Sequence, residues 1–114
     1  MMTFNEYDHI TCLSNDYGFD QWVSKTLEMY ACKGDMVILI SSSGNSMNMV
    51  NAARYANKSN IDVVTFTGFD EKNKLKKLGD LNFWVNSRAY NIVEMIHQIW
   101  LLAVCDSIIG SAEY

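Results

Sequence analysis

Apolar positions along the chain follow two alternating spacings, and this alternation predicts strands followed by helices. Four short runs rich in apolar or β-branched residues end in the Gly, Asn, Asp or Ser residues typical of turns. These runs predict strands at residues 9–13, 36–40, 61–67 and 81–85. The run at 36–40, Met-Val-Ile-Leu-Ile, is continuously apolar. We therefore expect it to be a central parallel strand covered on both faces.

Between these runs, apolar residues recur every three or four positions, as in amphipathic helices. The first helical stripe consists of Phe19, Trp22, Val23, Leu27 and Tyr30, and Gly34 follows where a glycine would end the helix. Further helices are expected at residues 46–59, 71–78 and 91–109. This order predicts an α/β domain with a mostly parallel sheet and a ligand site at the carboxyl ends of its strands.

Composition favours one domain over residues 1–114, since 49% of the residues are hydrophobic and no low-complexity segment interrupts them. A net charge of −4 opposes binding to nucleic acid or an anionic membrane. The three cysteines are far apart and form no Cys-x-x-Cys pair, which argues against a disulfide framework or a thiolate zinc site. The chain begins with no signal-like segment, and its longest apolar run covers only residues 99–105. We expect a cytoplasmic protein.

The most informative segment is Ser-Ser-Ser-Gly-Asn-Ser at residues 41–46, called the serine loop below. Four hydroxyls, a glycine and the free N–H groups of a helix N-terminus together favour binding of an anion such as a phosphate. The segment lacks the Gly-Lys-Ser/Thr of a nucleotide P-loop, the spaced glycines of a dinucleotide site and the glycine of a nucleophile elbow. The alternative is an ordinary polar turn that caps the helix through Asn45 or Ser46.

Four segments in order resemble the sugar isomerase (SIS) domain family, in its phosphoheptose isomerase branch. The serine loop is similar to the family's phosphate loop, SNDYGF at 14–19 to the loop after its second strand, and VVTFTGFD at 63–70 to its fourth strand and turn. The last helix falls where the family's catalytic helix lies. The resemblance implies a flavodoxin-like three-layer α-β-α sandwich that binds a sugar phosphate. It also implies a homodimer or homotetramer with sites between subunits.

The resemblance carries two sets of substrate-binding residues onto this chain. The phosphate would be held by Ser41, Ser42, Ser43 and Ser46. Asn15 and Asp16 would contact the sugar; otherwise they form an Asx turn that caps the next helix.

The last helix departs from the family pattern. The family's glutamine ligand falls on Glu94 and its histidine ligand on Leu102, so the family's zinc site is not intact and we expect no cofactor. Glu94, His97 and Gln98 share one helix face by spacing. We expect Glu94 to move a proton between C1 and C2 through an enediol, and His97 to shuttle the oxygen protons. Alternatively, both are polar interface residues without a chemical role.

The same helix carries an apolar stripe wider than one sheet face needs, which predicts burial in an oligomer. The stripe comprises Ile92, Ile96, Ile99, Trp100, Ala103, Val104 and Ile108. Its Glu-x-x-His spacing also occurs in di-iron bundles, but no second such helix is visible. His9, the only other histidine, is expected to be structural.

Nothing before residue 9 resembles the family's N-terminal helices, its first strand or the helix that bears its main base. We therefore expect an N-terminally truncated chain, a misassigned start, or a chain that borrows a strand from a partner. The sequence supports two functions: an isomerase that converts sedoheptulose 7-phosphate to a heptose 7-phosphate, and a non-catalytic phosphosugar-binding or regulatory module. A third hypothesis is an inert fragment that assembles only with itself.

Overall fold

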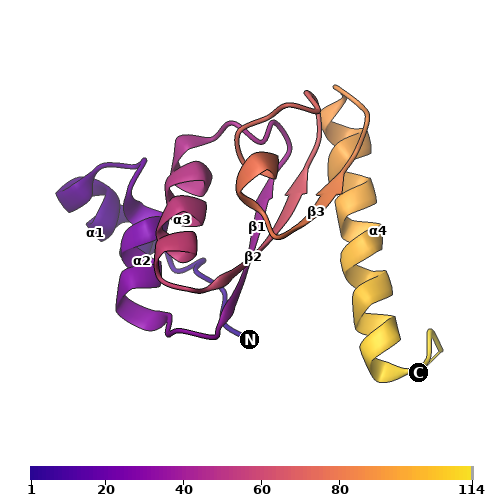
Figure 1. The fold of residues 1–114 in the computed structure, drawn as a ribbon, viewed down its shortest axis with the longest axis horizontal. Helices are drawn as coiled ribbons and strands as arrows, with labels where there is room; N and C mark the ends of the chain where they lie inside the picture. The colour runs from indigo at the N-terminus through magenta and orange to yellow at the C-terminus, as the bar shows by residue number, and fades with distance from the viewer. Residues whose placement is uncertain (114) are drawn as a thin grey trace.

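A computed structural model describes residues 1–113 and shows three layers (Figure 1). The middle layer is a parallel sheet in the order β1-β2-β3, with β1 at Met36–Ser41, β2 at Asp62–Thr67 and β3 at Leu81–Trp84. One side carries α1 (Tyr7–Tyr17), α2 (Trp22–Tyr30) and α3 (Met47–Lys58), and the other carries α4 (Tyr90–Ile109). The expected α/β three-layer fold is confirmed.

The carboxyl ends of the three strands lie side by side, and this end of the sheet is called its carboxyl edge below. Ser41 of β1 pairs with Thr67 of β2, and Thr67 pairs with Trp84 of β3. The segments that follow the strands therefore start side by side, and in parallel sheets this edge is where ligand sites form.

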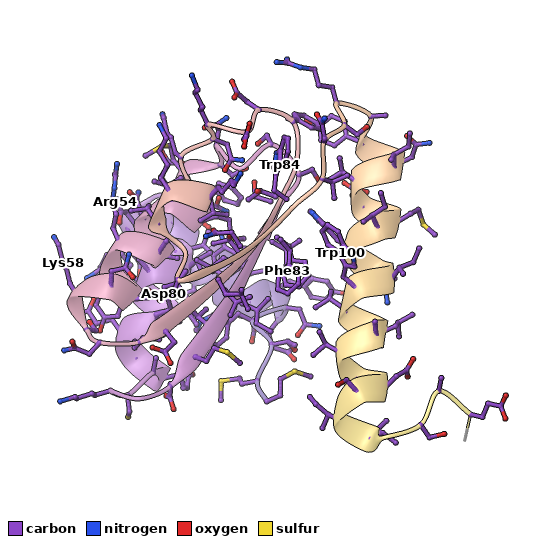
Figure 2. The ribbon with its side chains drawn as sticks, turned by 45° about the vertical axis from the view of Figure 1, so that its right-hand side comes forward. Arg54, Lys58, Asp80, Phe83, Trp84 and Trp100 are labelled. Atoms are coloured by element: carbon purple, nitrogen blue, oxygen red, sulfur yellow. The ribbon has the colours of Figure 1, made fainter. Side chains whose placement is uncertain are left out.

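Each face of the sheet is covered by a different apolar cluster. On the α2–α3 side, Val50, Ala53 and Ala56 of α3 recur at helical spacing and are fully buried. On the α4 side, the rings of Phe66 and Phe83 stack with their centroids 4.6 Å apart. The centroid of the Trp100 ring lies 5.7 Å from that of Phe83. Figure 2 shows Phe83 and Trp100 pointing toward one another between the sheet and α4.

The predicted strand at residues 9–13 is wrong, because these residues lie within α1. The run His-Ile-Thr-Cys-Leu is too short to distinguish the two spacings, yet Ile10 and Leu13 are three residues apart and both pack on the core. Thr11 also donates its hydroxyl to the carbonyl of Tyr7 at 2.8 Å. The helix satisfies its backbone internally, whereas a strand here would need a neighbouring strand.

β1 is an edge strand rather than the expected central one, because within residues 1–113 only β2 pairs with it. Leu39 and Ser41 are buried against the helical layer, whereas Met36, Ile38 and Ile40 are exposed on the other face. One face of this continuous apolar run is therefore uncovered.

The predicted helix at residues 71–78 is reduced to turns and a 3₁₀ helix at Lys76–Leu78. Side chains compete with the backbone for hydrogen bonds in this segment. The carboxylate of Asp70 accepts from the N–H of Lys72 at 2.8 Å, and the side-chain amide of Asn73 donates to the carbonyl of Asp70 at 2.8 Å. These bonds favour turns over a regular helix.

α4 covers the sheet with only part of its surface. Val93 and His97 are buried, but an 18-residue window of this helix has a mean hydropathy of 1.6 and is only 11% buried. Its length and composition alone would permit a membrane span, which is weak evidence because helices of soluble proteins meet the same criterion. Its contacts with the sheet are those of a covering helix.

Candidate functional site at the serine loop

The serine loop connects the end of β1 to the start of α3, at the carboxyl edge of the sheet. Ser41 is 8% exposed and its hydroxyl donates to that of Ser46 at 3.3 Å. The hydroxyl of Ser43 accepts the N–H of Asn45 at 3.2 Å, so its proton is free for another acceptor. The four predicted phosphate-binding serines are thus brought together.

Gly44 and the segment after β2 hold the loop in this shape. Gly44 has φ +63°, and a Cβ at this position would lie 2.1 Å from Oδ1 of Asn73. Its carbonyl accepts the N–H of Leu75 at 2.9 Å, and Oδ1 of Asn45 accepts the N–H of Lys74 at 3.2 Å. The backbone approach at Gly44 requires a glycine on both steric and conformational grounds.

Several backbone donors of the loop remain unused. Within residues 1–113, no hydrogen bond is found from the N–H groups of Ser43, Ser46, Met47 and Asn48, called the loop amides below. Ser46 precedes α3 in an extended conformation and its side chain makes no capping bond. Unpaired N–H groups at a helix N-terminus attract anions through hydrogen bonding and the helix dipole. The loop amides therefore favour an anionic ligand.

The serine loop opens into a cavity of about 260 Å³, called the serine cavity below. Its walls are formed by Ile40, Ser41, Ser42, Ser43, Ser46, Asn48, Met49 and Tyr90. Sequence reasoning missed Asn48, Met49 and Tyr90 as site residues. The position of Asn48 in the first helical turn gave a signal for it, but Tyr90 lies some forty residues further along the chain and no local pattern indicates it.

Glu94 reaches the serine loop from α4. Its Oε1 accepts the hydroxyl of Ser42 at 3.2 Å, and the side chain is exposed. The close approach depends on Gly68 at the end of β2, where a Cβ would lie 2.7 Å from both methyl groups of Val93. Glu94 thus contacts the serine loop through Ser42, although it is not among the residues that line the serine cavity.

His97 does not join Glu94, contrary to the expectation that the two share one exposed helix face. It is 2% exposed, and its Nε2 lies 3.0 Å from the carbonyl of Thr67. Its Nδ1 is buried without a partner, and its ring meets that of Phe66 edge-on. The imidazole therefore lies between α4 and the end of β2. This placement speaks against a chemical role for His97, but it buries the ring within the chain rather than at the subunit interface that the alternative named.

Asn15 and Asp16 lie in the last turn of α1 rather than in a loop after a strand. Both are exposed, and the side-chain amide of Asn15 donates to Asp16 at 3.0 Å. Neither lines the serine cavity, so the structure does not bring the predicted sugar-contacting pair to the predicted phosphate loop. His9 acts structurally, since its Nε2 lies 2.9 Å from the hydroxyl of Thr26 on α2.

The donor set does not fit the zinc ion that the family resemblance raises. A zinc site needs three or four His, Cys, Asp or Glu ligands at one point. Among residues 1–113, no three such side chains are grouped in a way that could hold a metal. Glu94 is a single carboxylate at the loop, and Leu102 supplies no ligand.

A second hollow, of about 290 Å³, lies between α2 and α3 and carries Lys25, Arg54 and Lys58. Figure 2 shows Arg54 and Lys58 projecting outward from α3. Lys25 is already paired with Glu28 at 2.7 Å, and the hydrogen bond to this carboxylate raises the pKa of Lys25 above its usual value. The groove between α2 and α3 could attract an anion only through cationic side chains at the surface, whereas the serine loop presents oriented backbone N–H groups. We therefore take the serine loop as the candidate site.

Comparison with known proteins agrees with the fold. The family model described as the SIS domain matches residues 1–68. The chain belongs to the SIS domain family. Over 107 residues this SIS domain is 36% identical to a phosphoheptose isomerase of Fusobacterium nucleatum, covering 94% of this chain and 55% of that protein. It is 33% identical to one of Shigella dysenteriae, covering 84% of this chain and 50% of that protein.

Solved structures give the same result for this SIS domain. A phosphoheptose isomerase from Neisseria gonorrhoeae matches with a TM-score of 0.88 and 29% identity over 93% of this chain and 59% of that chain. One from Francisella tularensis matches with a TM-score of 0.83 and 25% identity over 90% of this chain and 55% of that chain. The chain spans about half the length of the curated relatives it matches.

Proposed function

We propose that this SIS domain binds a sugar phosphate in the serine cavity and belongs to a ketose–aldose isomerase acting on sedoheptulose 7-phosphate. The observation that carries the proposal is the set of unpaired loop amides beside four serines, at the carboxyl edge of a parallel sheet. These donors suit a phosphate group. The similarity to phosphoheptose isomerases supports the substrate class.

Glu94 is the group that would perform the proton transfer. Its carboxylate would take a proton from C1 of the ketose and return it to C2 of the enediol. The hydroxyl proton must pass from O1 to O2 in the same reaction, and we assign this transfer to water because His97 is packed against the sheet. The hydrogen bond from Ser42 keeps the Glu94 side chain at the cavity.

The second candidate function is a phosphosugar-binding module without catalysis. One observation favours it: His97, the second predicted proton-transfer group, is buried against the end of β2 and does not reach the serine loop. A binding module needs the loop amides but no proton-transfer group. The two functions therefore differ in isotope exchange rather than in affinity.

The experiment is to incubate the chain with sedoheptulose 7-phosphate in D₂O, after binding has been measured by calorimetry. The isomerase predicts deuterium at C1 of the recovered ketose or at C2 of the aldose product. Glu94→Gln should abolish this exchange and leave the Kd within about threefold, because the amide keeps the shape but cannot accept the carbon-bound proton.

Asp106→Asn removes a carboxylate further along the same helix and serves as the matched control. Exchange that survives Glu94→Gln would assign the base to another residue. Saturable binding without exchange in the unaltered chain would support the binding module, and the absence of any binding by a folded chain would refute both functions.

We also propose that the chain works as a homodimer or homotetramer in the cytoplasm. The uncovered face of β1 and the exposed apolar residues of α4 support the assembly. The net charge of −4 is compatible with a sugar phosphate, bound by oriented amides, as the small-molecule partner.

A further inference from the structure

Tyr90 is the one aromatic side chain among the residues that line the serine cavity. It is the first residue of α4 and is 61% exposed. Glu94 lies one helical turn later, at i+4, so the two side chains occupy the same face of α4. Because Glu94 hydrogen-bonds to Ser42, this face of α4 is turned toward the serine loop.

The ring of Phe69 contacts the ring of Tyr90. The two rings meet edge-on, with centroids 4.8 Å apart and an interplanar angle of 74°. Phe69 has φ +57°, a left-handed conformation that is strained for a bulky residue. Its N–H donates to the carbonyl of Ser87 at 2.9 Å, which holds the turn in place. Strain that is maintained beside a candidate site points to a positional requirement there.

The cavity is lined by more than the serine loop. Met49 of α3 and Tyr90 of α4 also form its walls, so a ligand whose phosphate lies at the serines has further side chains to contact. Ligand sites commonly combine a few placed polar groups with apolar or aromatic walls that contact the rest of the ligand. Tyr90 and Met49 supply such walls, and the Tyr90 hydroxyl can also exchange hydrogen bonds with a sugar.

We propose that Tyr90 determines specificity by contacting the sugar portion of the ligand, and that Phe69 is the positioning residue that holds its ring. This inference rests on the proposed function, since it assumes a phosphate at the loop amides. It goes further by separating recognition into two parts. The loop amides bind the phosphate, and the Tyr90 ring distinguishes a phosphorylated sugar from phosphate alone.

The test compares the Kd for sedoheptulose 7-phosphate with that for inorganic phosphate, by calorimetry, in each variant. Tyr90→Ala should raise the Kd for the sugar phosphate about threefold to tenfold, the range of an aromatic contact, and should leave the Kd for phosphate within about twofold. Tyr90→Phe retains the ring and should retain most of the affinity. Tyr7→Ala removes an exposed tyrosine of α1 and should change neither Kd.

Phe69→Gly is the test of positioning. Glycine accepts the left-handed conformation, so this variant should fold, yet it should lower the preference for sugar phosphate over phosphate although Tyr90 is intact. An equal change in both Kd values, or no change in Tyr90→Ala, would overturn the inference while leaving the proposed function standing. If the unaltered chain binds neither ligand, the proposed function fails and the inference fails with it.

Discussion

Two residues of α4, Glu94 and His97, differ in exposure and therefore in what their side chains contact. Glu94 is exposed and hydrogen-bonds to Ser42, whereas His97, three residues later, is buried against the sheet. A histidine on a helix is often considered for acid–base chemistry because of its near-neutral titration. Here its Nε2 contacts the carbonyl of Thr67, which also accepts the N–H of Val85. The geometry makes His97 a docking residue for α4.

We therefore predict that His97→Ala lowers the free energy of unfolding by about 2–4 kcal/mol, through lost packing and one lost hydrogen bond. His97→Phe should cost less, because it refills the space and removes the buried unpaired Nδ1. Denaturant unfolding followed by circular dichroism measures both. Gln98→Ala, at the exposed neighbouring position, is the control and should stay within about 0.5 kcal/mol. Unchanged stability in His97→Ala would contradict the docking role.

At the scale of elements, the apolar runs located β1, α3, β2, β3 and α4 to within a few residues, because each run is long or is bounded by turn residues. The exceptions have physical causes. The five-residue run at 9–13 is compatible with either spacing, and only its packing on α2 makes it helical. Whether both faces of β1 are covered depends on which other helices and strands lie against them. The spacing of apolar residues along the sequence does not contain this information.

The residues of the candidate site also divide into those that local sequence identifies and those that only the folded chain brings to the site. The serine loop is local, so its six residues could be identified from the sequence as a candidate anion site. Tyr90 and Glu94 join it only because Gly68 lets α4 approach the end of β2, and this is a tertiary contact. The assignment of Asn15 and Asp16 rests on the resemblance alone, and in this chain neither residue lines the serine cavity.

The loop between β1 and α3 should tolerate no side chain at Gly44. Gly44→Ala combines a left-handed φ with a clash against Asn73, so we predict a loss of stability of about 1–3 kcal/mol and a marked loss of phosphate affinity. Gly34→Ala is the matched control, because Gly34 has φ +91° but a Cβ added there would meet nothing within 4 Å. Denaturant unfolding and calorimetry measure both variants. Equal losses of stability and of phosphate affinity in Gly44→Ala and Gly34→Ala would refute the steric requirement at Gly44.

At the scale of the whole molecule, the chain exposes more surface than its size requires. The accessible area is 7415 Å², against roughly 6,300 Å² expected for a folded monomer of 13.0 kDa. The radius of gyration is 14.6 Å, against about 13 Å expected for this length. Figure 1 shows the reason: α4 extends past the sheet toward the C-terminus. The excess of about 1,100 Å² is larger than the ~800 Å² that each partner buries in a standard interface.

The exposed side of α4 has the spacing of a helix–helix contact. Ile92, Met95, Ile99 and Leu102, called the α4 seam here, follow one another at intervals of three and four residues and are each about half exposed or more. Alternating intervals of three and four residues are typical of the contact line between two packed helices. The seam thus has the form of a contact line for another helix.

We predict that Met95→Lys combined with Ile99→Lys shifts the chain from oligomer to monomer, because two buried charges at a seam are costly. Sedimentation velocity measures the change. Tyr7→Lys, an exposed change on α1, should leave the oligomeric state as it is. A chain that is monomeric before substitution would contradict the proposed assembly.

We propose that the phosphate of a sugar phosphate lies at the loop amides. A ¹H–¹⁵N correlation titration of the labelled chain with sedoheptulose 7-phosphate, followed by the same titration with inorganic phosphate, tests this position. We expect saturable shifts that are largest at the loop amides of Ser43, Ser46, Met47 and Asn48 with both ligands. Largest shifts in the α2–α3 groove around Lys25 and Arg54, or no saturable shift in a folded chain, would contradict it.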